Sequence, residues 1–412
     1  MKTITSILIG LACLSVDAAT TNCPNANLST VQNAVNGMND GDTVNVPAGS
    51  VTWASTLSIT KHLSVIGAGT NSTIVTCNGQ AVQIQLSGSG IVRVSGIKFL
   101  GPSDNSDCMH IWCATNSRAR IDHCWIQNFN GSSPGGGFAF YNGCAGVVDH
   151  CTVVDCNRFA RTISPTSSTS ESSTPVEEWW VRTNTAWFPP DFASTNSMVY
   201  ESNVGIWNTF DSSGSGPNIM FSAQDGGGYV VRHSSFNVNI TVNSSAPQFF
   251  ECHGNQGVPS NPATPRGTYV LNIYSNTFTC TGLSSGVQFI TARAGSGLLF
   301  SNIVTGTASS LGIYFHEEDI DPTSSWFTGT IYDPITNYWI WGNVCNGTTY
   351  DGIPQPGYNT DAYMGNGVYF SNLVPAQVVT LVYPHPLVTA QDPPLPTKIT
   401  ARNLKISNVK IP

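Results

Sequence analysis

A short pattern of apolar and polar positions recurs along this chain. Val94–Phe99 is followed 27 residues later by Ile121–Ile126, and after a further 27 residues by Val148–Val153. The frame apolar-x-x-(Asn, Ser or Cys)-x-apolar then returns at irregular intervals, beginning at Val181, Val231, Ile273, Leu299 and Ile340. Periods in the twenties indicate a stack of similar units, none of which buries its apolar side alone.

Two kinds of solenoid have repeats of this length. A leucine-rich repeat has leucines at fixed offsets and a helical half, whereas the apolar positions here are Val, Ile and Phe, with Gly and Asn at the bends. That composition is typical of short strands separated by turns. We therefore expect an all-β chain that folds as a right-handed parallel β-helix.

Stacked coils place equivalent side chains on top of one another. We expect Val, Ile and Phe to point inward, and the recurring Asn or Ser to stand at a bend, where a ladder of amides satisfies backbone groups of the turn. Ordinary turn propensity also explains these Asn residues. Asp122-His123 and Asp149-His150 are equivalent pairs in adjacent coils. We interpret them as an outward polar ladder in preference to a metal site.

The two ends of the chain differ from the repeat. Leu28 to Met38 is amphipathic, with Ser29 or Thr30 as a candidate cap, and would close the first coil. After about Gly352 the repeat weakens and prolines accumulate. We expect this part to pack along the solenoid, cap its end and protect its edge. The predicted organisation is a β-helix over residues 19–350 and a C-terminal segment over 351–412.

Residues 1–18 have the pattern of a secretory signal peptide. Lys2 gives a positive start, Ile4 to Leu14 an apolar core, and Val16-Asp17-Ala18 a cleavage site of small residues. The apolar run is too short to span a bilayer, and no later run reaches the required length. We expect a secreted or cell-surface protein without a membrane span.

Removing residues 1–18 leaves eleven of the twelve cysteines, an odd number. Six of them lie between Cys108 and Cys156, where we expect disulfides. A zinc site is the alternative, but no pair has C-x2-C spacing. Buried half-cystines or stacked thiols explain the cysteines more simply.

The amino-acid composition limits the kinds of molecule that this protein is expected to bind. Only 10% of the 412 residues are charged and the net charge is −8, so a basic surface for nucleic acid is absent from the sequence. Asn, Ser, Thr and Gly are abundant, which predicts a neutral, hydroxyl-rich surface. Aromatic side chains that cover the apolar face of a sugar are further candidates. The tryptophans considered for this role are Trp179, Trp180, Trp187, Trp207, Trp326, Trp339 and Trp341.

The early part of the chain resembles a known group. Gly41-Asp42-Thr43-Val44, Val46-Pro47-Ala48-Gly49 and Leu63 to Gly69 look like the opening coils of right-handed parallel β-helix proteins of the pectate-lyase-like superfamily. The resemblance extends weakly to about residue 350. It implies a polysaccharide as the partner, but this superfamily includes lyases, hydrolases, epimerases and non-catalytic surface proteins.

Insertions that interrupt the repeat are expected to wall a groove. They span residues 164–175, 212–217 and 254–267. Polar groups recur beside them at comparable stations of successive coils. We place the groove there, with Asp225, Arg232 and Glu251 as substrate-binding residues and His253, Arg266 and Arg293 as catalytic residues.

Phe289 to Gly295, followed by Leu299 to Asn302, is similar to the arginine-glycine strand of alginate and chondroitin lyases. The resemblance implies that Arg293 assists proton transfer at C5 of a uronate. The lysine expected one coil earlier, near Tyr274, is missing. In a β-elimination, Arg266 or Arg232 would hold the carboxylate and His253 or Arg293 would move the proton.

Other chemistries remain open. No cofactor is required, but Ca²⁺ is a candidate for neutralising the carboxylate, and His316 to Asp321 could supply oxygen ligands. A hydrolase needs two carboxylates across the bond, for which Asp225 with Glu251 is a candidate pair. Two functions therefore stand: a lyase acting on uronic-acid-containing glycans, or a non-catalytic β-helix that binds glycans or self-assembles at a surface.

Overall fold

The structure is a computed structural model. It describes residues 18–102, 106–113, 116–130, 135–141, 144–163, 181–182, 187–188, 198–211, 219–224, 228–242, 248–252, 270–282, 286–293, 296–315, 335, 338–350, 370–371 and 383–389. The predicted signal peptide lies outside these residues apart from its last position. No helix among them is long and apolar enough to cross a membrane.

Strands of the described chain form three long sheets. Sheet A contains β1 (Thr20–Asn22), β2 (Thr43–Val46), β5 (Ser64–Gly67), β8 (Ser89–Ser95), β11 (Asn116–Asp122), β14 (Ala145–Asp149), β19 (Met198–Glu201), β22 (Gly228–Arg232), β25 (Val270–Tyr274), β28 (Ser296–Phe300), β31 (Tyr338–Trp341) and β34 (Phe370–Ser371). Sheet B contains β3 (Gly49–Trp53), β6 (Thr73–Cys77), β9 (Lys98–Leu100), β12 (Trp125–Gln127), β15 (Thr152–Val154), β20 (Val204–Asp211), β23 (Ser235–Val242), β26 (Thr277–Thr281), β29 (Ile303–Gly306), β32 (Asn343–Cys345) and β33 (Thr348–Tyr350). Sheet C contains β4 (Leu57–Ile59), β7 (Val82–Leu86), β10 (Asp107–Cys113), β13 (Gly136–Tyr141), β16 (Ala160–Ile163), β21 (Ile219–Gln224), β24 (Gln248–Cys252), β27 (Val287–Ala292) and β30 (Leu311–Phe315).

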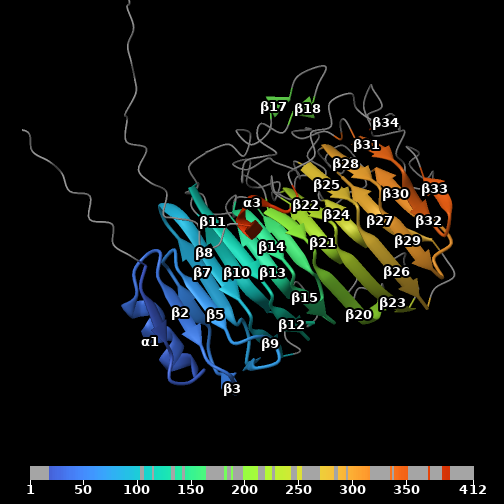
Figure 1. Cartoon of the computed structure of the whole chain (residues 1–412). Coiled ribbons are helices and arrows are strands. Elements are labelled where there is room, and N and C mark those ends of the chain that lie inside the picture. The colour runs from blue at the N-terminus through green and yellow to red at the C-terminus, as the bar shows by residue number, and fades with distance from the viewer. Residues whose placement is uncertain are drawn as a thin grey trace, which may run out of the picture.

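From β2 to β30, leaving aside β17 and β18, each coil contributes one strand to every sheet. The chain passes from sheet A to B to C and returns to A, where it pairs in parallel with the previous coil. Ile121 lies between Val94 and Val148, which is the predicted register. The coils follow one long axis, from the blue end with α1 to the orange end (Figure 1). The expectation of a right-handed parallel β-helix is confirmed.

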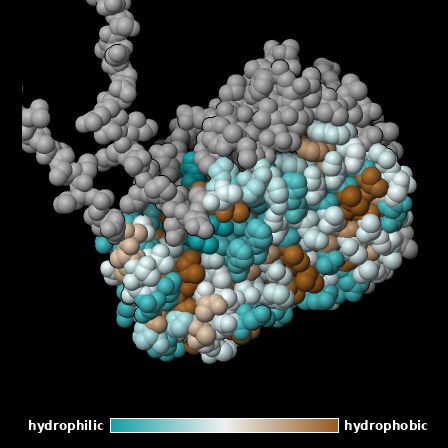
Figure 2. All heavy atoms as spheres, viewed as in Figure 1, coloured by the Kyte–Doolittle hydropathy of each residue, from teal (hydrophilic) through white to brown (hydrophobic). Residues whose placement is uncertain are grey.

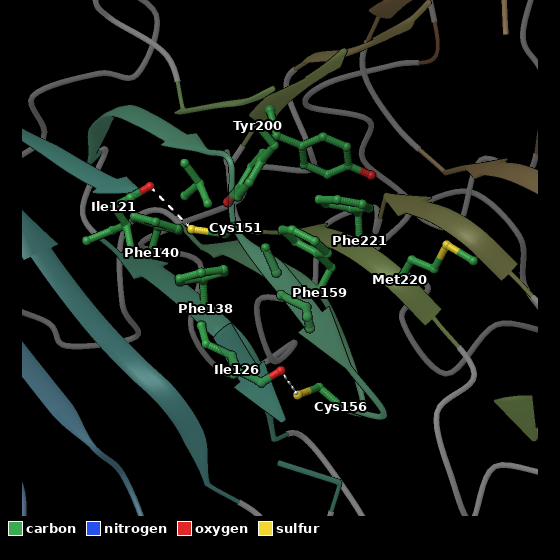
Figure 3. Packing of buried hydrophobic residues seen from close by; sticks show 14 of the residues in the cluster. Ile121, Ile126, Phe138, Phe140, Cys151, Cys156, Phe159, Tyr200, Met220 and Phe221 are labelled. Carbon is green, nitrogen blue, oxygen red and sulfur yellow. Dashed lines mark hydrogen bonds between the residues drawn. The ribbon is translucent and has the colours of Figure 1, made fainter. Parts of the chain in front are cut away.

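The interior is a continuous apolar column. Phe138, Phe140 and Phe221 point into it from sheet C, and Phe159 from the residue before β16 (Figure 3). Tyr200 from sheet A contacts Phe140, Phe159 and Phe221. Phe159 and Phe221 stack with ring centroids 5.0 Å apart. Burying such rings removes large apolar areas from water, which is the main favourable contribution to folding.

The described cysteines include both a disulfide and buried thiols, which are the two arrangements predicted for them. Cys113 and Cys144 form a disulfide within the predicted region. Other thiols are buried, and the Cys151 thiol donates to the carbonyl of Ile121 (Figure 3).

The predicted amide ladder stands at the bend between sheets A and B. The Asn302 side chain donates to the carbonyl of Ile273 and to Oδ1 of Asn343, at 2.9 Å in both cases. Its own Oδ1 accepts from the backbone and side-chain nitrogens of Asn276, at 3.2 and 3.0 Å. Asn203 and Ser234 continue the column. The ladder thereby satisfies backbone groups that the turn leaves without strand partners.

Two local expectations are wrong. Val181 does not begin a coil: Val181–Arg182 (β17) pairs in antiparallel fashion with Trp187–Phe188 (β18). The next coil begins instead at β19, where Tyr200-Glu201-Ser202-Asn203 has the repeat frame. The helix α1 (Leu28–Gly37) is present and buries Val31 and Val35 against the first coil, but its N-cap is Asn27, so Ser29 and Thr30 lie inside the helix.

Described parts of the C-terminal region pack along the solenoid. Strand β34 extends sheet A beside β31. The strap, defined here as residues 383–389, includes α3 (Pro386–Thr389) and covers part of the outer face of sheet A, at β14, β19 and β22. Its Leu387 packs with Val147, Val199 and Val230. Packing along the coils is therefore seen for these two pieces.

A buried ion pair lies beneath the strap. Arg232 donates to Oε2 of Glu201 at 2.6 and 2.8 Å, and both side chains are fully buried. The backbone N–H of His385 donates to the other oxygen of Glu201 at 2.8 Å. The N–H of Leu387 donates to Nδ1 of His385, so the docked strap selects an unprotonated Nδ1.

Removing one rung of the ladder should destabilise the solenoid. Asn302→Ala leaves the Ile273 carbonyl and the Asn276 N–H without their partners, so we expect the free energy of unfolding to fall by about 3 kcal/mol. Chemical denaturation measures this. Asn237→Ala, at an exposed position of β23, is the control and should change the free energy by less than about 0.5 kcal/mol. Equal effects would contradict a structural role for the ladder.

Docking of the strap should weaken in acid. Burial, helped by the charges of Arg232, Arg118 and Arg120, lowers the pKa of His385 from 6.5 to about 4. Below pH 6.5 the undocked strap takes up a proton that the docked strap does not, so stabilisation is complete above that pH and is lost as pH falls toward 4. Hydrogen exchange at the amides of His385 and Leu387 should accelerate, beyond its intrinsic pH dependence, between pH 7 and 4.5.

His385→Asn is the matched variant, because its Oδ1 accepts a hydrogen bond but does not titrate in this range. Its strap amides should keep the same protection across these pH values. Unchanged protection in the unsubstituted chain would contradict the proposed linkage.

Candidate functional site

The six residues expected to form the site fall into three groups. Asp225, His253 and Arg266 lie outside the described residues, as do the acidic segment from His316 to Asp321 and the three insertions. Glu251 and Arg293 lie together at sheet C. Arg232 belongs to sheet A.

Arg232 is not part of a shared groove with Glu251 and Arg293. It is completely buried, and its guanidinium contacts Glu201 and the hydroxyl of Tyr274, 3.1 Å away. The ring of Tyr383 from the strap lies 5.5 Å from its guanidinium carbon. In sequence, an arginine at the end of a strand looks the same whether it faces a groove or a covering segment.

The outer face of sheet C carries a row of polar side chains. Strand pairing places these residues side by side at one station of successive coils: Gln83, His110, Ala139, Arg161, Ser222, Glu251, Thr291 and Tyr314. Small side chains alternate with long ones along much of this row. The station spans several coils, which suits an extended ligand better than a small one.

Asp107 organises one end of this row. Its carboxylate is 2% exposed, and its Oδ2 accepts from Arg161 at 2.6 Å and contacts Nε2 of His110 at 3.0 Å. Arg161 also donates to the hydroxyl of Tyr141 at 2.8 Å. Gly136 pairs with Asp107 across the sheet, and a Cβ at this position would lie 2.9 Å from the carbonyl oxygen of Arg158. One buried carboxylate thus fixes a cation and an imidazole beside a phenol.

An aromatic platform adjoins the cluster. Trp112 and Tyr141 are cross-strand neighbours whose rings stack, with centroids 4.7 Å apart and planes 10° from parallel. The imidazole of His110 meets both rings edge-on, at 5.3 and 5.5 Å. The disulfide of Cys113 joins the residue after Trp112 to Cys144, just beyond β13. Stacking and a covalent link therefore hold the platform in place.

Burial shapes the protonation of these groups. It raises the pKa of the Tyr141 phenol, and the charge of Asp107 acts in the same direction, against Arg161. The phenol is therefore protonated at neutral pH and can donate a proton. Burial lowers the pKa of the half-buried Arg158, whereas Glu251 and Asp107 favour its charged form. An arginine retains its charge at neutral pH even so.

Glu251 and Arg293 form a second ion pair farther along the face. Nη1 of Arg293 lies 2.6 Å from Oε1 of Glu251, and the two side chains are 15% and 4% exposed. Ser222 separates Glu251 from Arg161 by two rungs of the sheet. Both residues were expected in one groove, and the structure places them in contact. The binding and catalytic roles expected for them stay predictions, and the Asp107 cluster was not predicted from the sequence.

The insertions join strands of sheet C. Residues 164–175 follow β16, residues 212–217 precede β21, and residues 254–267 follow β24. Each insertion is therefore adjacent in sequence to a strand of sheet C. Strand alternation was a signal for His110 and Trp112, which flank buried Ile111 in β10. Two buried residues, Cys108 and Met109, separate Asp107 from His110, so alternation alone does not place the carboxylate with them.

A second arrangement, in which His62 lies near Ser117 and Asp40, resembles a catalytic triad, but its serine is buried. Nε2 of His62 lies 3.0 Å from Oγ of Ser117, and its Nδ1 lies 3.6 Å from Asp40. Ser117 is 1% exposed and donates its proton to the carbonyl of Gly88. The hydroxyl is therefore engaged with the backbone, and we assign this cluster to structure.

The described residues contain no group of three or more His, Cys, Asp or Glu side chains placed to share a metal ion. Among the suggested tryptophans, Trp207 is buried and donates to the carbonyl of Cys156, while Trp339 and Trp341 lie on sheet A. The platform uses Trp112 instead.

No family model and no curated protein matches this chain. Among solved structures, it is similar to a mannuronic acid-specific polysaccharide family 6 lyase from human gut microbiota. The match has 13% sequence identity and a TM-score of 0.41, and it covers 79% of this chain and 74% of the other. The fold assignment rests on the sheet topology described above.

Loss of the Asp107 charge should disturb the whole cluster. Asp107→Asn leaves the partly buried Arg161 without its counter-ion, so we expect the free energy of unfolding to fall by about 3 kcal/mol. Chemical denaturation measures the change. The paired variant Asp107→Asn/Arg161→Met removes both charges and should recover part of the loss. An Asp107→Asn variant as stable as the original chain would contradict the role of this carboxylate.

Proposed function

We propose that this chain is a secreted polysaccharide-active protein that cleaves uronic-acid-containing glycans by β-elimination on the outer face of sheet C. The observation that carries the proposal is the buried Asp107, which holds Arg161 and His110 against the stacked rings of Trp112 and Tyr141. A cation for the carboxylate, a base, an acid and a flat ring for the sugar are thus adjacent.

Each group has a role that follows from its contacts. The Asp107 carboxylate only accepts hydrogen bonds, so the proton of His110 lies on Nε2 and Nδ1 carries the lone pair. Nδ1 is the base. Tyr141 accepts from Arg161 and has its own proton to give, so it is the acid. Arg161 offsets the carboxylate charge of the substrate, which lowers the cost of removing the neighbouring proton.

The reaction then balances as follows. His110 takes the proton from C5, the electron pair forms the C4–C5 double bond, and the bond from C4 to the glycosidic oxygen breaks. Tyr141 protonates the departing oxygen. Solvent returns the proton from His110 to Tyr141. Arg158 adds positive charge beside the cluster, and the Glu251–Arg293 pair provides contacts for sugars farther along the row.

The length of the face suits a polymer. From β10 to β27 the row crosses five rungs, which is about 24 Å at roughly 4.8 Å per rung. Stacked rings at one end and an ion pair at the other bind different parts of an extended chain. The neutral, hydroxyl-rich composition fits a carbohydrate partner better than a nucleic acid.

Binding without cleavage is the second candidate. It is favoured by the fact that Arg161 and Arg293 are each already paired with a carboxylate of the protein. A paired arginine still orients a sugar through hydrogen bonds but offsets less of the substrate charge. Such a protein would attach to a glycan surface, or assemble on one, without breaking bonds.

Activity of the mature chain separates the two. Incubation with a panel of uronate polymers, with and without Ca²⁺, should produce the ultraviolet absorbance of an unsaturated product. His110→Ala and Tyr141→Phe should each lower the rate at least about 100-fold, because each removes a proton-transfer group. His233→Ala, a histidine at sheet A, is the control and should retain the rate.

Calorimetric titration with the same polymers completes the test. Saturable binding without product would support the non-catalytic candidate. Product formation that is indifferent to both substitutions would contradict the assigned site.

A further inference from the structure

Two histidines outside sheet C form a pair at the bend between sheets A and B. His123 follows β11 and His150 follows β14, one coil later. Their rings are parallel within 3°, with centroids 5.0 Å apart. The side chains of His123 and His150 are 58% and 47% exposed, whereas the neighbouring carboxylates of Asp122 and Asp149 are buried.

Each imidazole is held by a buried carboxylate. Nδ1 of His123 lies 2.8 Å from Asp122, and Nδ1 of His150 lies 2.9 Å from Asp149. Both carboxylates are completely buried. They are fixed in turn by arginines, since Arg93 contacts Asp122 at 2.7 and 2.9 Å and Arg120 contacts Asp149 at 3.1 and 3.3 Å.

These contacts determine the tautomer. A carboxylate paired with arginine accepts hydrogen bonds, so Nδ1 of each ring carries the proton and Nε2 carries the lone pair. Within the described chain, neither Nε2 has a hydrogen-bond partner. A carboxylate behind one nitrogen, with the other nitrogen open, is the usual outer-shell arrangement of a metal-binding histidine.

The fold does not require histidine at this position. Both residues have positive φ, 50° and 52°, and other coils place Gly96, Ser202 or Ser301 in the same conformation. Two adjacent Asp-His pairs are therefore a chemical feature added to a turn that forms without them.

We propose that His123 and His150 bind a divalent transition-metal cation of the Zn²⁺, Ni²⁺ or Cu²⁺ class, with water completing the coordination. Imidazole suits these cations. Nitrogen ligands lie about 2.1 Å from such an ion, so two adjacent ligands of a tetrahedral site are about 3.4 Å apart. The two rings, whose centroids are now 5.0 Å apart, reach that separation of the Nε2 atoms by tilting toward each other. Arg93 and Arg120 are balanced by the two carboxylates, so no net positive charge opposes the ion.

This site is independent of the proposed activity. It lies at the turn after sheet A, whereas the glycan face is on sheet C. Loss of polysaccharide cleavage would leave the metal proposal unaffected, and the converse also holds.

Tag-free full-length mature protein tests the proposal by titration with Zn²⁺ and Ni²⁺ in a calorimeter. We expect one saturable site, and His123→Ala or His150→Ala should weaken binding at least about tenfold. That expectation follows because loss of an outer-shell partner alone costs roughly 10- to 100-fold. His233→Ala is the matched control: it stands in the same turn conformation, between Ser202 and Ser275, and should bind as the original protein does.

A second measurement needs no variant. The electron paramagnetic resonance spectrum of the protein with one equivalent of Cu²⁺ should show coupling to two imidazole nitrogens. The proposal is overturned by the absence of saturable binding, by binding that survives both substitutions unchanged, or by a copper spectrum with a single nitrogen ligand.

Discussion

Parallel pairing between successive coils is the constraint on which the structure depends. Hydrogen bonds of the backbone set a rise of about 4.8 Å per coil, so each residue lies directly on its equivalent in the previous coil. Each side chain must therefore pack favourably against a similar side chain in the next coil. Amides meet that condition because they donate and accept, as Asn276, Asn302 and Asn343 do.

At the C-terminal ends of three neighbouring strands of sheet A, the stacked side chains are charged. Asp122, Asp149 and Glu201 occupy successive rungs and are all buried, a column of like charges that cannot stand alone. Burial alone would raise the pKa of Asp122. Hydrogen bonds from Arg93 and His123, with the charge of Arg120, reverse this and lower it. The next rung is Arg232, and the rungs after it are aromatic: Tyr274, Phe300 and Trp341 stack with ring centroids 4.7 and 4.3 Å apart.

The repeat made the fold predictable from the sequence, because the constant interval between Val94, Ile121 and Val148 indicated their register. The interval gave no guidance where an insertion interrupts the repeat. Val181 was therefore assigned to a coil because it matches the frame by chance, and the actual coil at Tyr200 was not predicted. Site residues were harder. Glu251, in β24, and Arg293, just after β27, belong to strands of one sheet, whereas Arg232 ends a strand of another. The sheet that a strand joins depends on turns that have no distinctive sequence pattern.

Sheet C breaks the rule that like stacks on like. Along its outer station His110, Arg161 and Glu251 are separated by Ala139 and Ser222, so each long side chain lies against a short one. A column that served only the fold would repeat similar residues, as the ladder at the bend does with Asn and Ser. Alternation instead leaves room for different chemistries at neighbouring rungs, and Asp107 can reach across to hold two of them. Such a row gives up the benefit of stacking, which is expected where selection acts on binding to an extended partner.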